Sequence, residues 1–93
     1  MRGMVMKWLP EGEDELRLIA RRRMEEGQLP SNAPSRMWAG HGTGQRCALC
    51  DEPIQHGEIE WEVEEQEQGA RRVFPFHSRC QAVWEMECGA ARR

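Results

Sequence analysis

The sequence predicts a small α+β domain held together by one zinc ion, and three patterns support this expectation. Apolar residues recur at helical spacing near the N-terminus, a later segment alternates as a β-strand does, and two pairs of metal-ligand residues flank the predicted strands. The 93-residue chain is 39% hydrophobic and 31% charged. Such a chain buries little apolar area for its length, so we expect it to need a crosslink.

The first predicted element is a helix over residues 11–27. Its acidic beginning suits the positive end of the helix dipole, and Gly27 suits the helix end. Four apolar residues recur at helical spacing: Leu16, Ile19, Ala20 and Met24.

Residues 27–45 are predicted to be an irregular linker that lies over the core, because their Pro and Gly residues do not favour a helix or a strand. The stretch "GHGTGQ" at 40–45 resembles a phosphate-binding loop in composition, but it has no Lys and lacks the last Gly of a dinucleotide fingerprint. We therefore divide the chain into residues 1–45, a helix and a Gly/Pro-rich linker, and residues 46–93, a metal-binding domain.

The second segment predicts a β-hairpin followed by a helix. "EIEWEVEE" at 58–65 alternates acidic with apolar residues, which indicates a strand with one solvated and one buried face. Gly69 predicts the turn, and "RRVFPF" at 71–76 predicts the returning strand, where Pro75 restricts it to a sheet edge or to its own end. Residues 77–89 predict a helix that Gly89 ends.

Two pairs of ligand residues bracket this hairpin. Cys47-x2-Cys50 forms a tight turn that directs two thiolates at one point, and His77-x2-Cys80 places two ligands on one face of a first helical turn. Four N/S ligands suit one tetrahedral, structural Zn²⁺; a disulfide or metal-free thiols are the alternative. Cys88 lies too far along the helix to join them, and we expect it to be a buried apolar residue or, alternatively, a reactive thiol.

The turn, hairpin and ligand-bearing helix resemble the treble-clef zinc fingers, and the ligand pattern is most similar to the first zinc module of LIM domains. The resemblance covers residues 47–87 and implies zinc on Cys47, Cys50, His77 and Cys80. It ends there, because Val83 stands where a LIM domain would begin its second ligand set. "CALCDEPI" with the later "FHSRC" is also similar to small bacterial proteins of uncharacterised function.

Two charged groups are candidate partner-binding residues. One is an acidic ladder on one strand face, which is either a solvated face or a docking site for a basic partner; its members are Glu58, Glu60, Glu62 and Glu64. The other is a basic patch within Arg17–Arg23 that is either a solvated helix face, a nucleic-acid contact or a protein contact; its members are Arg17, Arg21 and Arg22.

Charge and composition narrow the function classes. Residues 1–46 hold 8 Lys/Arg and 6 Asp/Glu, whereas residues 47–93 hold 5 and 10, so a nucleic-acid binder of a single charge sign fits poorly. No apolar run suggests a signal peptide or a membrane span, and no catalytic constellation is evident, so we expect a cytoplasmic protein that is not an enzyme. The leading expectation is an adaptor or regulator that binds a protein partner, and a homodimer is possible. The alternative is a nucleic-acid-binding transcriptional regulator.

Overall fold

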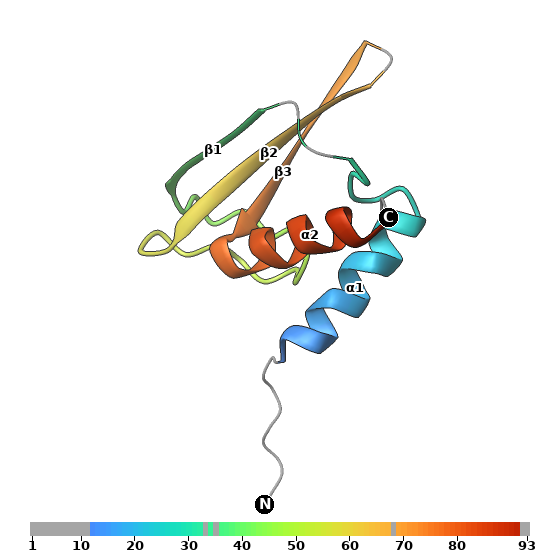
Figure 1. Cartoon of the computed structure of the whole chain (residues 1–93). Coiled ribbons are helices and arrows are strands. Elements are labelled where there is room, and N and C mark those ends of the chain that lie inside the picture. The colour runs from blue at the N-terminus through green and yellow to red at the C-terminus, as the bar shows by residue number, and fades with distance from the viewer. Residues whose placement is uncertain (1–11, 33, 35, 68, 92–93) are drawn as a thin grey trace, which may run out of the picture.

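The computed structural model describes residues 12–32, 34, 36–67 and 69–91, and these form an α+β fold of two helices and one antiparallel sheet (Figure 1). The elements along the chain are α1 (Glu13–Glu25), β1 (Arg36–His41), β2 (Ile59–Glu67), β3 (Ala70–His77) and α2 (Ser78–Ala91). The three strands lie in the order β1-β2-β3. No helix in this described part of the chain is long and apolar enough to cross a membrane.

Helix α1 confirms the first predicted element, whose expected first residue lies outside the described residues. Acidic side chains occupy its first turn and basic ones its last turn, as the helix dipole favours. Gly27 takes a φ of 77°, the left-handed conformation that lets the chain leave the helix. The residues that α1 buries are Leu16, Ala20 and Met24.

Strand β1 corrects the prediction of an irregular linker over residues 27–45. Arg36–His41 pairs along its whole length with β2, for example Met37 with Val63. The prediction was wrong because every residue of this edge strand is exposed, so burial imposes no alternating pattern on its sequence. The boundary drawn at residues 45 and 46 consequently runs between two strands of one sheet.

Strand β2 corrects the expectation that its acidic face is solvated. Val63 is buried as predicted, but Glu60 and Glu64 are only 2% and 4% exposed, whereas Ile59 is 48% exposed. Glu60 is covered by hydrogen bonds from Thr43 and Gln45, which come before β2 in the chain, and Glu64 is covered by an ion pair with Arg71 of the adjacent strand. The alternation of β2 alone does not indicate these contacts.

Strand β3 confirms the second strand of the hairpin. It lies at the sheet edge, as Pro75 requires, and Gly69 turns the chain with a φ of 82°. Helix α2 follows directly after His77. It extends past Gly89, so the predicted helix end at Gly89 was wrong. Gly89 is not among the glycines with positive φ, so it does not act as a left-handed helix cap.

The core lies between α2 and one face of the sheet. Trp84 is fully buried, its ring stacks on Phe76 at 5.4 Å, and its indole N–H donates to the carbonyl of Pro30 at 2.9 Å. Phe76 is paired with Trp61, so these residues mark the face that α2 covers. Figure 1 shows α2 beside β2 and β3, with β1 on the far edge of the sheet.

We call the opposite side of the sheet the open sheet face. On each strand it carries every second residue, namely those whose side chains point away from the Phe76 side. Register places Trp38, Glu62 and Pro75 in one row across it and Arg36, Glu64 and Val73 in the next. No described helix packs there, because the helix that contacts β2 and β3 lies on the Phe76 side.

Gly42 generates the first prediction. A Cβ at this position would lie 1.8 Å from the carbonyl oxygen of Gln55, so the loop backbone passes too close for any side chain. We expect Gly42→Ala to lower the free energy of unfolding by about 1–3 kcal/mol, the usual cost of overpacking. Chemical denaturation of the metal-loaded protein measures it.

The control is Gly57→Ala, because a Cβ at Gly57 meets nothing within 4 Å. We expect its effect to stay within about 0.5 kcal/mol. Equal effects of the two substitutions would contradict the close approach at Gly42.

Candidate metal centre

The four predicted ligands come together in one cluster. The ligand atoms of Cys47, Cys50, His77 and Cys80 all lie within 4.8 Å of one another. Two come from a turn before β2, one from the last residue of β3 and one from the first turn of α2. We call the turn and its return, residues 46–53, the knuckle; a bridge between Arg46 and Pro53 closes it.

Backbone hydrogen bonds shape the knuckle. The N–H of Asp51 donates to the carbonyl of Cys47 at 3.0 Å, and Asp51 takes a φ of 69° that turns the chain back. The N–H of Leu49 points at the sulfur of Cys47 at 3.4 Å, an arrangement that stabilises negative charge on that sulfur. The N–H of Ala48 donates to the carbonyl of Pro75 at 2.7 Å and so fixes the knuckle against β3.

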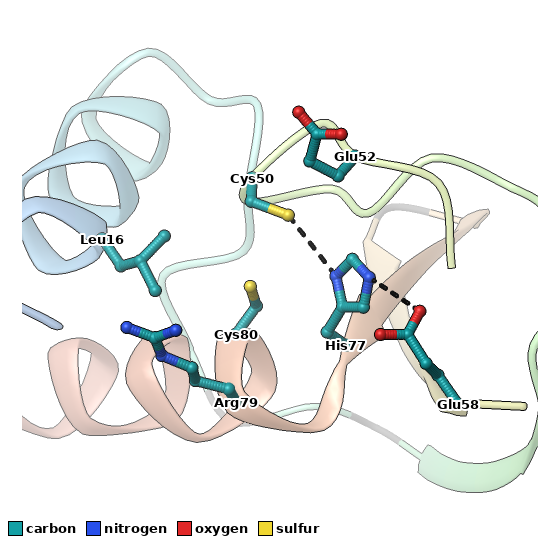
Figure 2. Close-up of a pocket in the computed structure, with 7 residues that line it drawn as sticks. All are labelled: Leu16, Cys50, Glu52, Glu58, His77, Arg79 and Cys80. Atoms are coloured by element: carbon teal, nitrogen blue, oxygen red, sulfur yellow. Dashed lines mark hydrogen bonds and ion pairs between the residues drawn. The ribbon is translucent and has the colours of Figure 1, made fainter. Parts of the chain in front are cut away.

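The ring of His77 is oriented from both sides. Its Nδ1 lies 3.4 Å from the sulfur of Cys50, and its Nε2 lies 3.5 Å from Oε1 of Glu58 (Figure 2). The same Nε2 lies 3.3 Å from the carbonyl oxygen of Pro53. Two acceptors at Nε2 favour the tautomer with the proton on that nitrogen, which leaves the lone pair of Nδ1 for a metal. Glu58 is in turn held by the backbone N–H of Gln55 at 2.8 Å.

The three thiols are mutually dependent. Hydrogen bonds with Cys50 and Cys80 lower the pKa of Cys47 far below its ordinary value, while the contact with Cys47 raises the pKa of both Cys50 and Cys80. Three sulfurs this close cannot all ionise without a cation between them. The donor set therefore fits a metal ion, and three thiolates with one imidazole are typical of zinc.

The cluster is buried on one side and reachable on the other. Cys47 and Cys80 are buried, whereas Cys50 and His77 border a cavity of about 340 Å³. Cys80 also lines this cavity, and the remaining lining residues are Leu16, Glu52, Glu58 and Arg79. Figure 2 shows the sulfurs of Cys50 and Cys80 turned toward the ring of His77, with Glu58 at its far nitrogen.

The acidic ladder is not one continuous surface. Glu60 accepts hydrogen bonds from the N–H and hydroxyl of Thr43, both at 2.9 Å, and from Gln45 at 3.0 Å. Glu64 pairs with Arg71 at 3.0 Å across the hairpin. Glu58 belongs instead to the surroundings of His77.

Glu62 is the ladder member on the open sheet face that contacts Trp38. Its Oε1 accepts a hydrogen bond from the indole N–H of Trp38 at 2.9 Å. Burial raises the pKa of Glu62, and the neighbouring Glu60 raises it further. An added positive charge beside Glu62 would therefore be stabilising.

The basic patch on α1 has a partner inside the protein. Arg17 and Arg21 pair with the buried carboxylate of Glu87 on α2, at 2.9 and 3.1 Å, whereas Arg22 is exposed. The hydrogen bond from Arg17 lowers the pKa of Glu87 below its ordinary value. This stabilisation is complete above the ordinary carboxyl pKa and is lost as the pH falls through the lower folded value.

Glu87 is a residue that sequence reasoning missed. The signal was present, because Glu87 lies seven residues after Cys80 and three after Trp84, on the apolar face of its helix. An acid on a buried face needs a cation, and the nearest candidates were the arginines of α1. Cys88 is buried, as the first expectation for it stated.

Comparison with protein-family models, curated proteins and solved structures finds no match to this chain. The Cys3His cluster indicates a metal-binding module and could hold one ion, whose expected identity from the donor set is zinc.

Loss of a ligand should remove both metal and structure. We expect native mass spectrometry to count one metal ion per chain in the unaltered protein and none in Cys80→Ser. We also expect Cys80→Ser to unfold residues 46–91, because the knuckle and β3 lose their crosslink to α2. Cys88→Ala is the matched control, since Cys88 lies on the same helix outside the cluster. A cooperatively folded Cys80→Ser protein would contradict a structural role for the ion.

The contact at Nε2 of His77 generates a separate prediction. Glu58→Gln weakens the acceptor that orients the ring, so zinc affinity measured by competition with a chelator should fall about 10- to 100-fold. Glu52→Gln is the control, because Glu52 lines the same cavity and the contacts of His77 Nε2 are with Glu58 and Pro53. Equal affinities for the two variants would show that the carboxylate of Glu58 does not act on His77.

Proposed function

We propose that the protein is a treble-clef-like zinc module without catalytic activity that binds another protein. The observation that carries the proposal is the complete set of four protein ligands on one site, drawn from the knuckle, the end of β3 and the start of α2. Such a closed set is typical of structural zinc, whereas a catalytic zinc keeps a position open for water or substrate.

The ion would serve folding. Structural zinc contributes about 10–16 kcal/mol of apparent binding free energy in small zinc modules, more than the whole net stability of many domains. None of the four cysteines of the chain is in a disulfide, which suits a reducing, cytoplasmic setting.

The open sheet face is the best-supported docking surface. Trp38 is 37% exposed there, Val73 lies exposed in the neighbouring row, and Glu62 lies between β1 and β3. An aromatic and an aliphatic group beside a partly buried carboxylate suit a partner that presents a Lys or Arg next to an apolar side chain. The partner class is thus a protein with a mixed basic and apolar surface.

Nucleic-acid binding through Arg17–Arg23 is the alternative, and it has less support. Arg17 and Arg21 already neutralise Glu87, so the patch offers phosphate less charge than its sequence suggests. The acidic residues of the first turn of α1 lie on the same helix.

Matched variants separate the two functions. Val73→Lys places a positive charge on the open sheet face, where it would repel a basic partner. Arg22→Glu alters the basic patch and leaves the contacts to Glu87 intact. We expect zinc-loaded protein to capture a basic partner from its own cell extract, and expect Val73→Lys but not Arg22→Glu to abolish the capture.

The opposite pattern would transfer support to the alternative. Retention on DNA or RNA that weakens steeply with salt and is lost in Arg22→Glu would identify a nucleic-acid contact. Capture that neither variant changes would reject the open sheet face as the docking surface.

A further inference from the structure

The two edges of the sheet differ in how they are protected. On β3, Pro75 has no N–H, and its carbonyl already accepts a hydrogen bond from Ala48 of the knuckle. On β1 all six residues are exposed, and no other described strand lies beyond them (Figure 1). The strand has no Pro or Lys and no bulge, the devices that usually prevent edge pairing.

The hydrogen-bond pattern identifies which backbone groups of β1 face outward. The N–H of Gly42 donates to the carbonyl of Glu58 at 2.9 Å, so position 42 points toward β2. Orientation alternates along an antiparallel strand, and positions 40, 38 and 36 therefore also point toward β2. The N–H and C=O groups of Met37, Ala39 and His41 consequently face the open edge.

We propose that two copies of this chain associate through β1, antiparallel and with Ala39 opposite the second copy's Ala39, to form one six-stranded sheet. The three outward-facing residues are spaced symmetrically about Ala39. In this register Met37 meets the second copy's His41 and the reverse, so every outward N–H and C=O finds a partner.

Side chains on the open sheet face fit this register. Trp38 lies opposite the second copy's Gly40, where a Cβ would meet nothing within 4 Å. An indole that is 37% exposed can therefore lie over the bare backbone of a glycine in the neighbouring strand, an arrangement that stabilises edge glycines. On the other face, the small Ala39 side chains meet at the symmetry axis.

Charge also matches in this register. Arg36, whose side chain is 73% exposed, lies opposite the second copy's Gly42, and Gly42 pairs with Glu58 in its own sheet. Arg36 and the second copy's Glu58 therefore share one row, in which the backbone carbonyl of Gln55 lies against Gly42, and Glu58 is 49% exposed. The symmetry axis produces this opposite-charge pair twice, which favours a second copy over an unrelated strand.

Self-association and the exchange of three amides test the proposal. Sedimentation velocity of the zinc-loaded protein should show a dimer whose fraction rises with concentration. Hydrogen exchange followed by NMR should show protection of the Met37, Ala39 and His41 amides in the dimer. A protein that stays monomeric at all concentrations, or a dimer in which these three amides exchange freely, would overturn the proposal.

Two proline variants locate the interface. Ala39→Pro removes an outward N–H at the centre of β1, and we expect the dimer Kd to rise about tenfold or more. Val73→Pro makes the same change on β3, where position 73 shares the outward orientation of Pro75, and should leave the Kd unchanged. Equal effects of the two variants would reject β1 as the interface.

A third measurement covers the case in which a proline variant fails to fold. Arg36→Glu places like charges in the shared row and should weaken the dimer without changing a hydrogen bond of the strand ladder. Unchanged dimerisation of a folded Arg36→Glu protein would reject the register. Protection of the three amides only after addition of an unrelated extended peptide would assign the edge to a foreign strand and overturn the proposal.

Discussion

The convergence of three thiols and one imidazole at the junction of β3 and α2 is the constraint on which the rest of the structure depends. His77 ends the strand and Cys80 lies in the first turn of the helix, so no loop separates the two elements. Holding both to the knuckle fixes the direction in which α2 leaves the sheet, and that direction brings Trp84 onto Phe76. A small apolar core alone would allow α2 many orientations, whereas four ligand bonds allow few.

Three buried carboxylates give the fold a second level of specification. Glu60 fixes the Thr43 loop to β2, Glu64 joins the two strands of the hairpin through Arg71, and Glu87 joins the two helices through Arg17 and Arg21. Each buried charge is costly unless its partners lie in one particular place, so these contacts contribute more to a unique arrangement than to net stability. A protein with few apolar side chains thus uses charged groups to fix how its elements pack.

The sequence predicted the features that are encoded locally. The CxxC turn and the HxxC spacing predicted the ligand cluster because each pair is confined to a single turn, and the hairpin between them was predicted by alternation and by Gly69. Strand β1 could not be predicted in this way, since all its side chains are exposed and its pairing is with a strand about twenty residues later. The burial of Glu60 likewise depends on hydrogen bonds from Thr43 and Gln45. These two residues can lie beside Glu60 because the backbone of Gln55 passes close to Gly42.

In the proposed function, the metal centre and the surfaces have separate roles. A zinc ion held by four protein side chains would have no free position with which to act on another molecule, so recognition would fall to the sheet. The open sheet face and the edge of β1 are continuous, because Trp38 belongs to both. Pairing of two copies through β1 would join two open faces across the symmetry axis, so that a partner with repeated basic and apolar groups would bind both at once. Bivalent contact of this kind raises affinity without adding a new type of contact, which is how a domain with a small recognition surface can act as an adaptor.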